Sequence, residues 1–254
     1  MQTITFIGNG NMAKSIAQGL KGKYNIEVVG RNMERLDAFE AALGKKVEKF
    51  PLDDFDITDK TILLCIKPGN LEGVAKQLKG KAKLLLSVLA GVPVEKLKKK
   101  IKSKAVVRAM PNLAASVGAS MTTLTGDAEH KEEAEVLMCS AGSVLWLESE
   151  KEIDIATALA GSGPAYLALI AEALADGAVN QGLKREDAML VMRGLFAGFG
   201  KLIQEMHPAL LKDSVMSPGG TTAAGYYTLE KGRVRASCME AVEKAYKKAV
   251  DLSS

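Results

Sequence analysis

The chain has 254 residues, of which 47% are hydrophobic and 25% charged, and its formal net charge is +4. This length is enough for one large domain or two ordinary ones, and the composition is typical of a globular protein rather than a disordered one. The mild charge, with lysines on stretches of helical spacing that we expect to be solvated, argues against nucleic-acid binding. The chain starts directly on a predicted strand without a basic and then apolar leader, so we expect a cytoplasmic location.

The cysteines and histidines exclude several kinds of site. Cys65, Cys139 and Cys238 lie far apart within apolar runs, which fits neither a disulfide framework nor a metal site, so we predict buried thiols and no bound metal. His130 and His207 lie in polar surroundings outside any glycine-rich turn. Dehydrogenases that act on alcohols usually need a histidine or lysine as proton carrier, and neither histidine is placed for that role.

The first predicted unit is a strand from Thr3, a glycine turn and a helix from Asn11. Gly8 allows a sharp turn, Gly10 has no Cβ to block a diphosphate, and Ala13 lets the helix and strand pack closely. The diphosphate would lie at the amino end of the helix, so the pattern predicts a dinucleotide site, with a purely structural turn as the alternative. The residues expected to bind the cofactor here are Gly8, Asn9, Gly10, Asn11, Met12 and Ala13.

The end of the second predicted strand indicates which dinucleotide binds. This strand runs from Tyr24 to Gly30 and is followed by Arg31, Asn32 and a predicted helix from Met33 to about Leu43. An NAD site would place an acidic residue here to accept a hydrogen bond from the ribose 2′-hydroxyl. Arg31 instead offers a fixed, forked cation that suits a 2′-phosphate. We therefore expect NADP, with Asn32 as a second donor and NAD as the less favoured cofactor, unless Arg31 is only a surface residue.

Three further predicted strands end in residues that would face the cofactor. They are Lys60 to Ile66, Leu84 to Leu89 and Ala105 to Ala109, and a helix to about Leu78 follows the first. Their continuous apolar character fits burial on both faces of a parallel sheet, whose ligands bind at the carboxyl ends of the strands. We predict that the nicotinamide half of the cofactor is lined by Lys67, Pro68, Ala90, Gly91, Pro111 and Asn112. A solvated lysine and a rigid Pro-Asn turn are the alternatives.

After about Glu150 the strand-like runs end and the chain becomes rich in Ala, Leu and Met with helical spacing. We predict an α/β fold, with an N-terminal Rossmann-type doubly wound sheet over residues 1–150 and a C-terminal all-helical domain over residues 151–254. One apolar run to Val179 is long enough to suggest a membrane span, but Glu172 and Asp176 lie on one face of it. We expect a core or interface helix instead, and no membrane association.

Three further motifs lie far apart in the chain, and they are Arg108-Ala-Met-Pro-Asn112, Gly161-Ser-Gly-Pro-Ala-Tyr166 and Ser217-Pro-Gly-Gly-Thr-Thr222. Together they resemble the motifs of the pyrroline-5-carboxylate reductase family. With the Gly8 turn and Lys67-Pro68, the resemblance covers essentially the whole chain. It implies NAD(P)H-dependent reduction of 1-pyrroline-5-carboxylate to L-proline, and makes the C-terminal domain a substrate-binding and dimerisation domain. A homodimer through these helices, in some members assembled into a decamer, is also implied.

The Ser217 to Thr222 motif forms a turn that leads into a predicted helix, so the N–H groups of Gly220, Thr221 and Thr222 can converge on a substrate carboxylate. The resemblance places the Thr222 hydroxyl on the imine nitrogen, which makes Thr222 the expected catalytic residue. A protonated imine needs no side-chain acid, so catalysis would depend on positioning. The expected substrate-binding residues are Ser217, Gly219, Gly220, Thr221 and Thr222, and a helix-capping turn is the alternative.

The sequence departs from the family pattern at Leu89, where a small residue is expected, at Leu113-Ala114, and at Ser214, where an amide side chain is frequent. Two other functions compete with the reductase. An NADP-dependent 3-hydroxyacid dehydrogenase would share the two-domain plan but carry a lysine after the second glycine turn, and Gly161 to Ala173 contains none. A non-catalytic NADP-binding module would not need the Ser217 to Thr222 motif.

Overall fold

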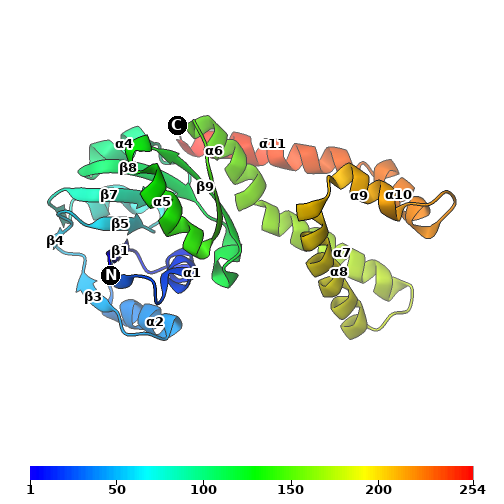
Figure 1. Ribbon diagram of the computed structural model, residues 1–254, viewed down its shortest axis with the longest axis horizontal. Helices are drawn as coiled ribbons and strands as arrows, with labels where there is room; N and C mark the ends of the chain where they lie inside the picture. The colour runs from blue at the N-terminus through cyan, green and yellow to red at the C-terminus, as the bar shows by residue number, and fades with distance from the viewer. Residues whose placement is uncertain (254) are drawn as a thin grey trace. The chain divides into compact units, whose positions relative to one another are not determined.

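An eight-stranded, mainly parallel sheet forms the centre of the first part of the chain (Figure 1). All neighbouring strands are parallel except β8 and β9, which are antiparallel. Across the sheet, the strands are β10 (Gly142–Trp146), β9 (Ser120–Gly126), β8 (Ser103–Met110), β7 (Ala82–Ser87), β5 (Thr61–Leu64), β1 (Thr3–Ile7), β2 (Asn25–Gly30) and β3 (Glu48–Pro51). This computed structural model describes residues 1–253. The strand order confirms the predicted doubly wound sheet, with β9 and β10 added at one edge.

Helices cover both faces of this sheet because its central strands are apolar on both sides. The helices α1 (Asn11–Leu20), α2 (Met33–Leu43) and α5 (Lys131–Met138) bury their apolar residues against one face. The helices α3 (Leu71–Ala75) and α4 (Val94–Lys100) do so against the other. The period of two in a strand produces this division, since Phe6 of β1 belongs to the first core and Ile7 to the second.

The rest of the described chain is helical. It consists of α6 (Glu150–Ala156), the π-helical turn η5 (Thr157–Gly161), α7 (Gly163–Asn180), α8 (Arg185–Glu205), α9 (Pro208–Val215), α10 (Thr221–Lys231) and α11 (Val234–Ser253). The backbone contacts divide the chain into a first unit, Met1–Ser162 with the end of α11 from Lys244, and a second unit, Gly163–Glu243. The helix α6 therefore belongs to the first unit. The domain boundary that we predict at residue 150 stays a prediction.

Several local expectations differ from the structure. The sequence analysis missed the edge strand β3 and the helix α9, and the helix predicted to reach Leu78 ends at Ala75, beyond which Leu78 begins a short strand pair, β4 (Phe55–Asp56) with β6 (Leu78–Lys79). The prediction of three buried thiols is also wrong, since Cys139 and Cys238 are exposed. Cys139 begins the short turn η4 (Cys139–Ala141) directly after the buried Met138, and Cys238 lies on α11, which has no buried side chain among those described.

The helices of the second unit leave a large apolar surface uncovered within one chain. Leu190 of α8 is 69% exposed and Met239 of α11 is 70% exposed. The helical stretch Glu150–Asn180, with a mean hydropathy of 1.4, is long and apolar enough to cross a membrane by length and composition, and only 17% of its apolar window is buried. Large exposed apolar surfaces in soluble proteins mark interaction sites, so these helices are candidates for an interface.

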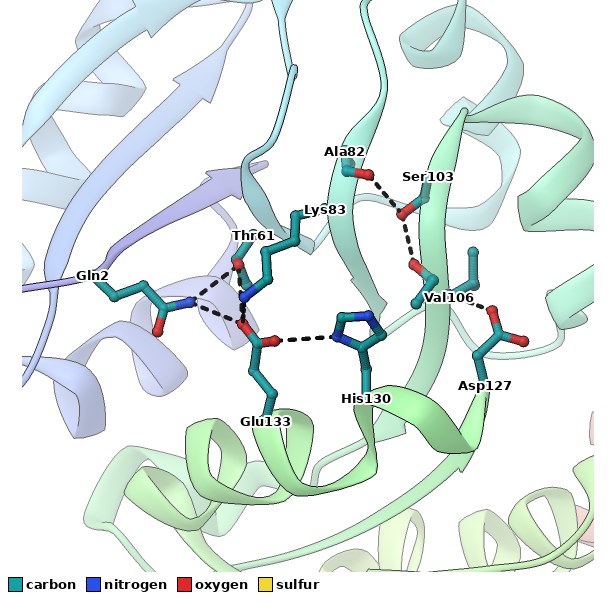
Figure 2. Close-up of polar contacts among 10 residues, drawn as sticks. Gln2, Thr61, Ala82, Lys83, Ser103, Val106, Asp127, His130 and Glu133 are labelled. Atoms are coloured by element: carbon teal, nitrogen blue, oxygen red, sulfur yellow. Dashed lines mark hydrogen bonds and ion pairs between the residues drawn. The ribbon is translucent and has the colours of Figure 1, made fainter.

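At the amino-terminal edge of the sheet, one carboxylate on α5 connects three strands (Figure 2). Glu133 Oε1 accepts hydrogen bonds from Lys83 Nζ at 2.7 Å and from Gln2 Nε2 at 3.0 Å. It also accepts from Thr61 Oγ1 at 3.4 Å, and Glu133 Oε2 lies 3.2 Å from His130 Nδ1. Burial alone would raise the pKa of Glu133, but the bonds from Lys83, His130 and Gln2 outweigh it and hold this pKa below its usual range.

We expect Glu133→Gln to lower the free energy of unfolding at pH 7 by about 1 kcal/mol, the upper end for a partly exposed ion pair. Because the folded-state pKa of Glu133 is lowered, its stabilisation is complete above the unfolded-state pKa of about 4.3 and is lost as pH falls through the lower folded value. Urea unfolding of both proteins should therefore converge in acid. Glu132→Gln, at an exposed neighbour, is the control; equal losses from the two variants would contradict the role of Glu133.

Candidate active site

A cleft of about 200 Å³ lies at the carboxyl ends of β1, β2 and β5. Five of the predicted cofactor residues line this cleft: Gly8, Asn9, Gly10, Arg31 and Lys67. The walls between them are mainly apolar and include Val29, Leu52, Ile66 and Val74. The cleft lies where the strand order reverses on the two sides of β1, which is where doubly wound sheets bind their ligands.

The backbone of Gly8 is fixed between the ends of two strands. Its φ is 105°, and its N–H donates to the Val29 carbonyl at 3.0 Å. A Cβ at this position would lie 2.3 Å from the Cys65 carbonyl oxygen. Because this oxygen belongs to the backbone, it cannot move aside to relieve so short a contact. Burial raises the pKa of the Cys65 thiol to about 12, so this thiol stays protonated beside the turn. Only glycine fits here, for a reason internal to the protein.

The next glycine, Gly10, is different because a Cβ there would meet nothing within 4 Å. Gly10 precedes α1, has no side-chain cap, and is followed by no acidic residue in the first turn. Lys14 is the first residue whose N–H bonds back to the Gly10 carbonyl, at 3.0 Å, so the N–H groups before it have no partner within the helix. Such an uncapped helix start suits an anionic group.

Asn11, Met12 and Ala13 are not among the residues that line the cleft. Ala13 is completely buried in the first core, where α1 packs on the sheet. The side chain of Ala13 therefore acts in the packing that we predict from its small size, and any cofactor contact from Ala13 is left to its backbone.

Two arginines lie together beyond the end of β2. Arg31 and Arg35 both line the main cleft and an adjoining hollow of about 370 Å³, which Asn9 and Asn32 complete. Both arginines are exposed, and neither guanidinium has a carboxylate partner among the described residues. The sequence analysis missed Arg35, although its position one helical turn after Arg31 was a usable signal.

Asn32 is partly committed to the helix that follows it. Its side-chain oxygen accepts a hydrogen bond from the Arg35 N–H at 3.0 Å and so caps the start of α2. Only the amide nitrogen of Asn32 remains as a donor toward a ligand. The cap also fixes the first turn of α2, on which Arg35 lies.

The other predicted nicotinamide-side residues are not brought into the cleft. Pro68 begins the short turn η1 (Pro68–Asn70) and is exposed, while Ala90 and Gly91 follow β7. Leu89 is only 1% exposed and lies in the second core, which explains why a large residue is tolerated there. Pro111 is buried after β8. The cofactor roles of these residues stay predictions.

Both ends of the Asn112 side chain have protein partners. Its oxygen accepts from the Ala114 N–H at 3.1 Å, and its nitrogen donates to the Ala160 carbonyl at 3.1 Å. Asn112 thus ties the end of β8 to the π-helical turn η5. This arrangement favours the alternative that Asn112 shapes a turn, and its predicted contact with a cofactor stays untested.

In the second unit, the segment from Ser217 to Thr222 forms a tight turn into α10. Gly219 has a φ of 71°, and Gly220 lies so close to Ser217 that a Cβ on it would be 2.5 Å from Ser217 Oγ. The positive φ makes Gly219 the glycine that the turn itself requires, whereas a Cβ on Gly220 would need the Ser217 side chain to move. Gly220 precedes the helix without a side-chain cap.

The set of free N–H groups in this turn begins one residue later than the set that we predict. The Gly220 N–H donates to the Ser217 carbonyl at 3.0 Å, so the prediction that it is free is wrong. The first N–H that bonds back within the helix belongs to Ala224. The N–H groups of Thr221, Thr222 and Ala223 are consequently the ones that lack an intrahelical partner. Thr221 and Thr222 are both exposed.

A polar network behind the turn joins α10 to α11. Tyr226 donates to Glu230 Oε1 at 2.7 Å, and Arg235 binds both the Tyr226 hydroxyl and the Glu230 carboxylate. The bond to Glu230 raises the pKa of Tyr226, and Arg235 lowers the pKa of Glu230. Lys212 of α9 also lies over the Tyr226 ring, 5.7 Å from its centre. Sequence reasoning found none of these residues, and they hold α10 in place within the second unit.

Comparison with known proteins adds independent information. Residues 150–252 match the family model described as pyrroline-5-carboxylate reductase dimerisation, and residues 3–91 match that described as NADP oxidoreductase, coenzyme F420-dependent. The chain is 37% identical to the pyrroline-5-carboxylate reductase of Pisum sativum over 99% of this chain and 96% of that protein.

Two solved structures are similar over the whole chain. The 1-pyrroline-5-carboxylate reductase of Streptococcus pyogenes is 33% identical, with a TM-score of 0.85 over 98% of each chain. The pyrroline carboxylate reductase of Plasmodium falciparum, which was solved with NADP bound, is 27% identical, with a TM-score of 0.82 over 99% of this chain and 100% of that one.

We expect Gly8→Ala to lower the free energy of unfolding by about 3 kcal/mol, since the new methyl group overlaps the Cys65 carbonyl and the residue keeps a positive φ. Gly22→Ala is the matched control, because Gly22 also has a positive φ, 82°, but has open space around it. This control should lose about 1 kcal/mol or less. Thermal unfolding measures both, and equal losses would show that the contact with Cys65 has no energetic weight.

Proposed function

Because this chain belongs to the pyrroline-5-carboxylate reductase family, we propose that it reduces 1-pyrroline-5-carboxylate to L-proline with NADPH. The observation that carries the proposal is the similarity to the Pisum sativum reductase over 99% of the chain, which takes in the Gly8 turn and the Ser217 to Thr222 turn. The cofactor supplies a hydride for the imine carbon. The protonated imine nitrogen becomes a neutral amine without any further proton, so the protein needs no acidic side chain at this step.

The first unit has the features that an NADP cofactor requires. The open face of Gly10 and the uncapped start of α1 receive the diphosphate, while the apolar cleft beyond Gly8 holds the rest of the cofactor. Lys67 lines this cleft and adds a positive charge at the end of β5. Asn9, Asn11 and Met12 complete the proposed diphosphate loop. Pro68, Ala90, Gly91, Pro111 and Asn112 remain the proposed nicotinamide-side residues.

Preference for NADPH over NADH comes from the end of β2. Arg31 and Arg35 form a pair of exposed guanidinium groups that no carboxylate of the described residues neutralises, and the Asn32 amide nitrogen lies beside them. A 2′-phosphate meets two forked donors there, whereas a 2′-hydroxyl offers the two cations no negative charge to pair with. NAD is therefore the weaker cofactor of this proposal.

The substrate is held by the turn before α10. Its carboxylate accepts from the N–H groups of Thr221, Thr222 and Ala223, at the positive end of the helix. Ser217, Gly219 and Gly220 give the turn the shape that exposes these groups. The Thr222 hydroxyl accepts or donates at the imine nitrogen and orients the ring for hydride addition, so catalysis is a matter of positioning.

A second copy of this chain covers the exposed apolar helices. The family model that matches residues 150–252 is described as a dimerisation model, and the uncovered side chains of α7, α8 and α11 lie within that range. Asp176 pairs with Arg185 at the end of α7, which suits a protein interface better than lipid. We place the dimerisation domain at residues 151–254 and the enzyme in the cytoplasm, with a decamer as a larger assembly. A monomeric mass in sedimentation velocity would contradict this.

We expect Arg31→Ala and Arg35→Ala each to weaken NADPH binding about tenfold or more, since a hydrogen bond to a charged group contributes about 1.5 to 3 kcal/mol. NADH binding should change little, because NADH has no 2′-phosphate. Fluorescence titration gives both dissociation constants. Lys46→Ala, which removes an exposed cation outside the cleft, is the control. An unchanged ratio of NADPH to NADH affinity would remove that arginine from 2′-phosphate recognition.

The proposed function is tested by NADPH oxidation with 1-pyrroline-5-carboxylate, beside NADH and a set of 3-oxoacids. We expect rapid imine-dependent oxidation, faster with NADPH, and silence with the oxoacids. Thr222→Ala should lower kcat about tenfold or more while NADPH affinity stays at the wild-type value, because its hydroxyl acts on the substrate. Thr221→Ala keeps its backbone donor and is the matched control. Tight NADPH binding without any turnover would instead indicate a regulatory module.

A further inference from the structure

Arg108 is a buried cation whose role the proposed reaction does not explain. It lies on β8 and is 1% exposed. One terminal nitrogen donates to Glu150 Oε1 at 2.9 Å and the other to Asp154 Oδ1 at 2.8 Å. The two carboxylates are one helical turn apart on α6, so the guanidinium fork matches the spacing of that helix face. The Arg108 Nε has no hydrogen-bond partner among the described residues, so the polar attachment of Arg108 to α6 depends on its two terminal nitrogens.

The Glu150 carboxylate also contacts a third element, α4. Glu150 Oε1 also accepts the Val94 N–H at 2.9 Å, at the start of α4, which has no side-chain cap of its own. Val94 follows the loop that carries Ala90 and Gly91, two proposed cofactor residues. Glu150 therefore connects β8, α6 and the chain beyond β7 at one point.

The turn η5, which follows α6, is attached to the end of β8 as well. Asn112, just beyond β8, donates to the Ala160 carbonyl in the π-helical turn η5. A capping box of Ser149 and Glu152 sets the start of α6. The segment from Glu150 to Gly161 is thus tied to the sheet near its beginning by Arg108 and near its end by Asn112. It leads directly into α7 of the second unit at Gly163.

We propose that Arg108 is a positioning residue for hydride transfer, acting through Glu150 and Asp154. It holds the helix α6, through which the chain passes from the nucleotide-binding unit into the unit that contains the substrate turn. Loss of this attachment frees α6 on the sheet without altering Gly8, Gly10, Arg31 or Lys67, so cofactor binding persists while alignment of cofactor and substrate suffers. The inference rests on the proposed reductase function for its kinetic consequence, but not for the attachment itself.

The test compares Arg108→Lys and Arg108→Met with wild type. Lysine keeps the charge but not the two-point fork, and methionine keeps only the bulk. Lys104→Met is the matched control, because Lys104 lies four residues earlier on β8 in an exposed ion pair with Asp59. We expect faster amide hydrogen exchange over residues 150–162 in both Arg108 variants and not in the control. With NADPH bound beforehand and the imine saturating, the single-turnover rate should fall about 10- to 100-fold, while the stoichiometry of NADPH binding stays unchanged.

Unchanged amide exchange in the Arg108 variants would overturn the attachment. Faster exchange with a wild-type single-turnover rate would overturn the positioning role and leave Arg108 as a purely structural residue. A fall in NADPH stoichiometry in step with the rate would mean general misfolding and would also overturn it. If Arg108→Met does not fold, Arg108→Lys and Asp154→Asn decide the question. Failure of wild type to reduce the imine would refute the proposed function separately, and the exchange measurement would still decide the attachment.

Discussion

The contact between Gly8 and the Cys65 carbonyl is the constraint on which the cofactor cleft depends. Gly8 follows β1 and Cys65 follows the adjacent parallel strand β5. A Cβ on Gly8 would lie 2.3 Å from the Cys65 carbonyl oxygen, so no side chain fits at this position. This close approach turns the chain sharply out of the sheet and into α1 with its first N–H groups uncapped. The uncapped helix start and the apolar cleft beside it therefore follow from a single packing requirement. Gly10 has open space beside it, so its lack of a side chain is not required by packing.

The carboxyl ends and the amino ends of the strands carry different kinds of polar groups. At the carboxyl edge, cationic and amide side chains at the ends of β2 and β5 are exposed and largely without protein partners, as a site that binds an anionic cofactor requires. At the amino ends of the strands, Glu133 accepts hydrogen bonds from Lys83, Gln2 and Thr61, so its negative charge has partners within the protein. The amino ends therefore carry a paired charge, whereas the carboxyl ends carry cations that are unpaired within the described chain, beside the tightly packed Gly8 turn.

Local patterns explain what the sequence could predict. The glycine turn, Arg31 and the apolar strands are each encoded in a few consecutive residues, so their types and places were predictable. The strand β3 was missed because a short edge strand such as Glu48–Pro51 is only half apolar. Arg35 was missed although its position four residues after Arg31 was a usable signal, whereas the commitment of the Gly220 N–H depends on which backbone groups pair in three dimensions. Arg108 was visible as part of a motif, but its burial between Glu150 and Asp154 joins residues more than forty positions apart.

The chemistry of imine reduction explains why so few side chains of the proposed site are acids or bases. When the substrate already carries its proton, the remaining demands on the protein are to hold one anionic substrate and one anionic cofactor, and to align them. In our proposal, backbone N–H groups at the uncapped starts of α1 and α10 meet the first demand in each unit by the same physical means. Alignment is then the property that distinguishes an active enzyme from a protein that merely binds both molecules. In our proposal, the ties between β8 and α6 contribute to this alignment together with the Thr222 hydroxyl, which orients the substrate.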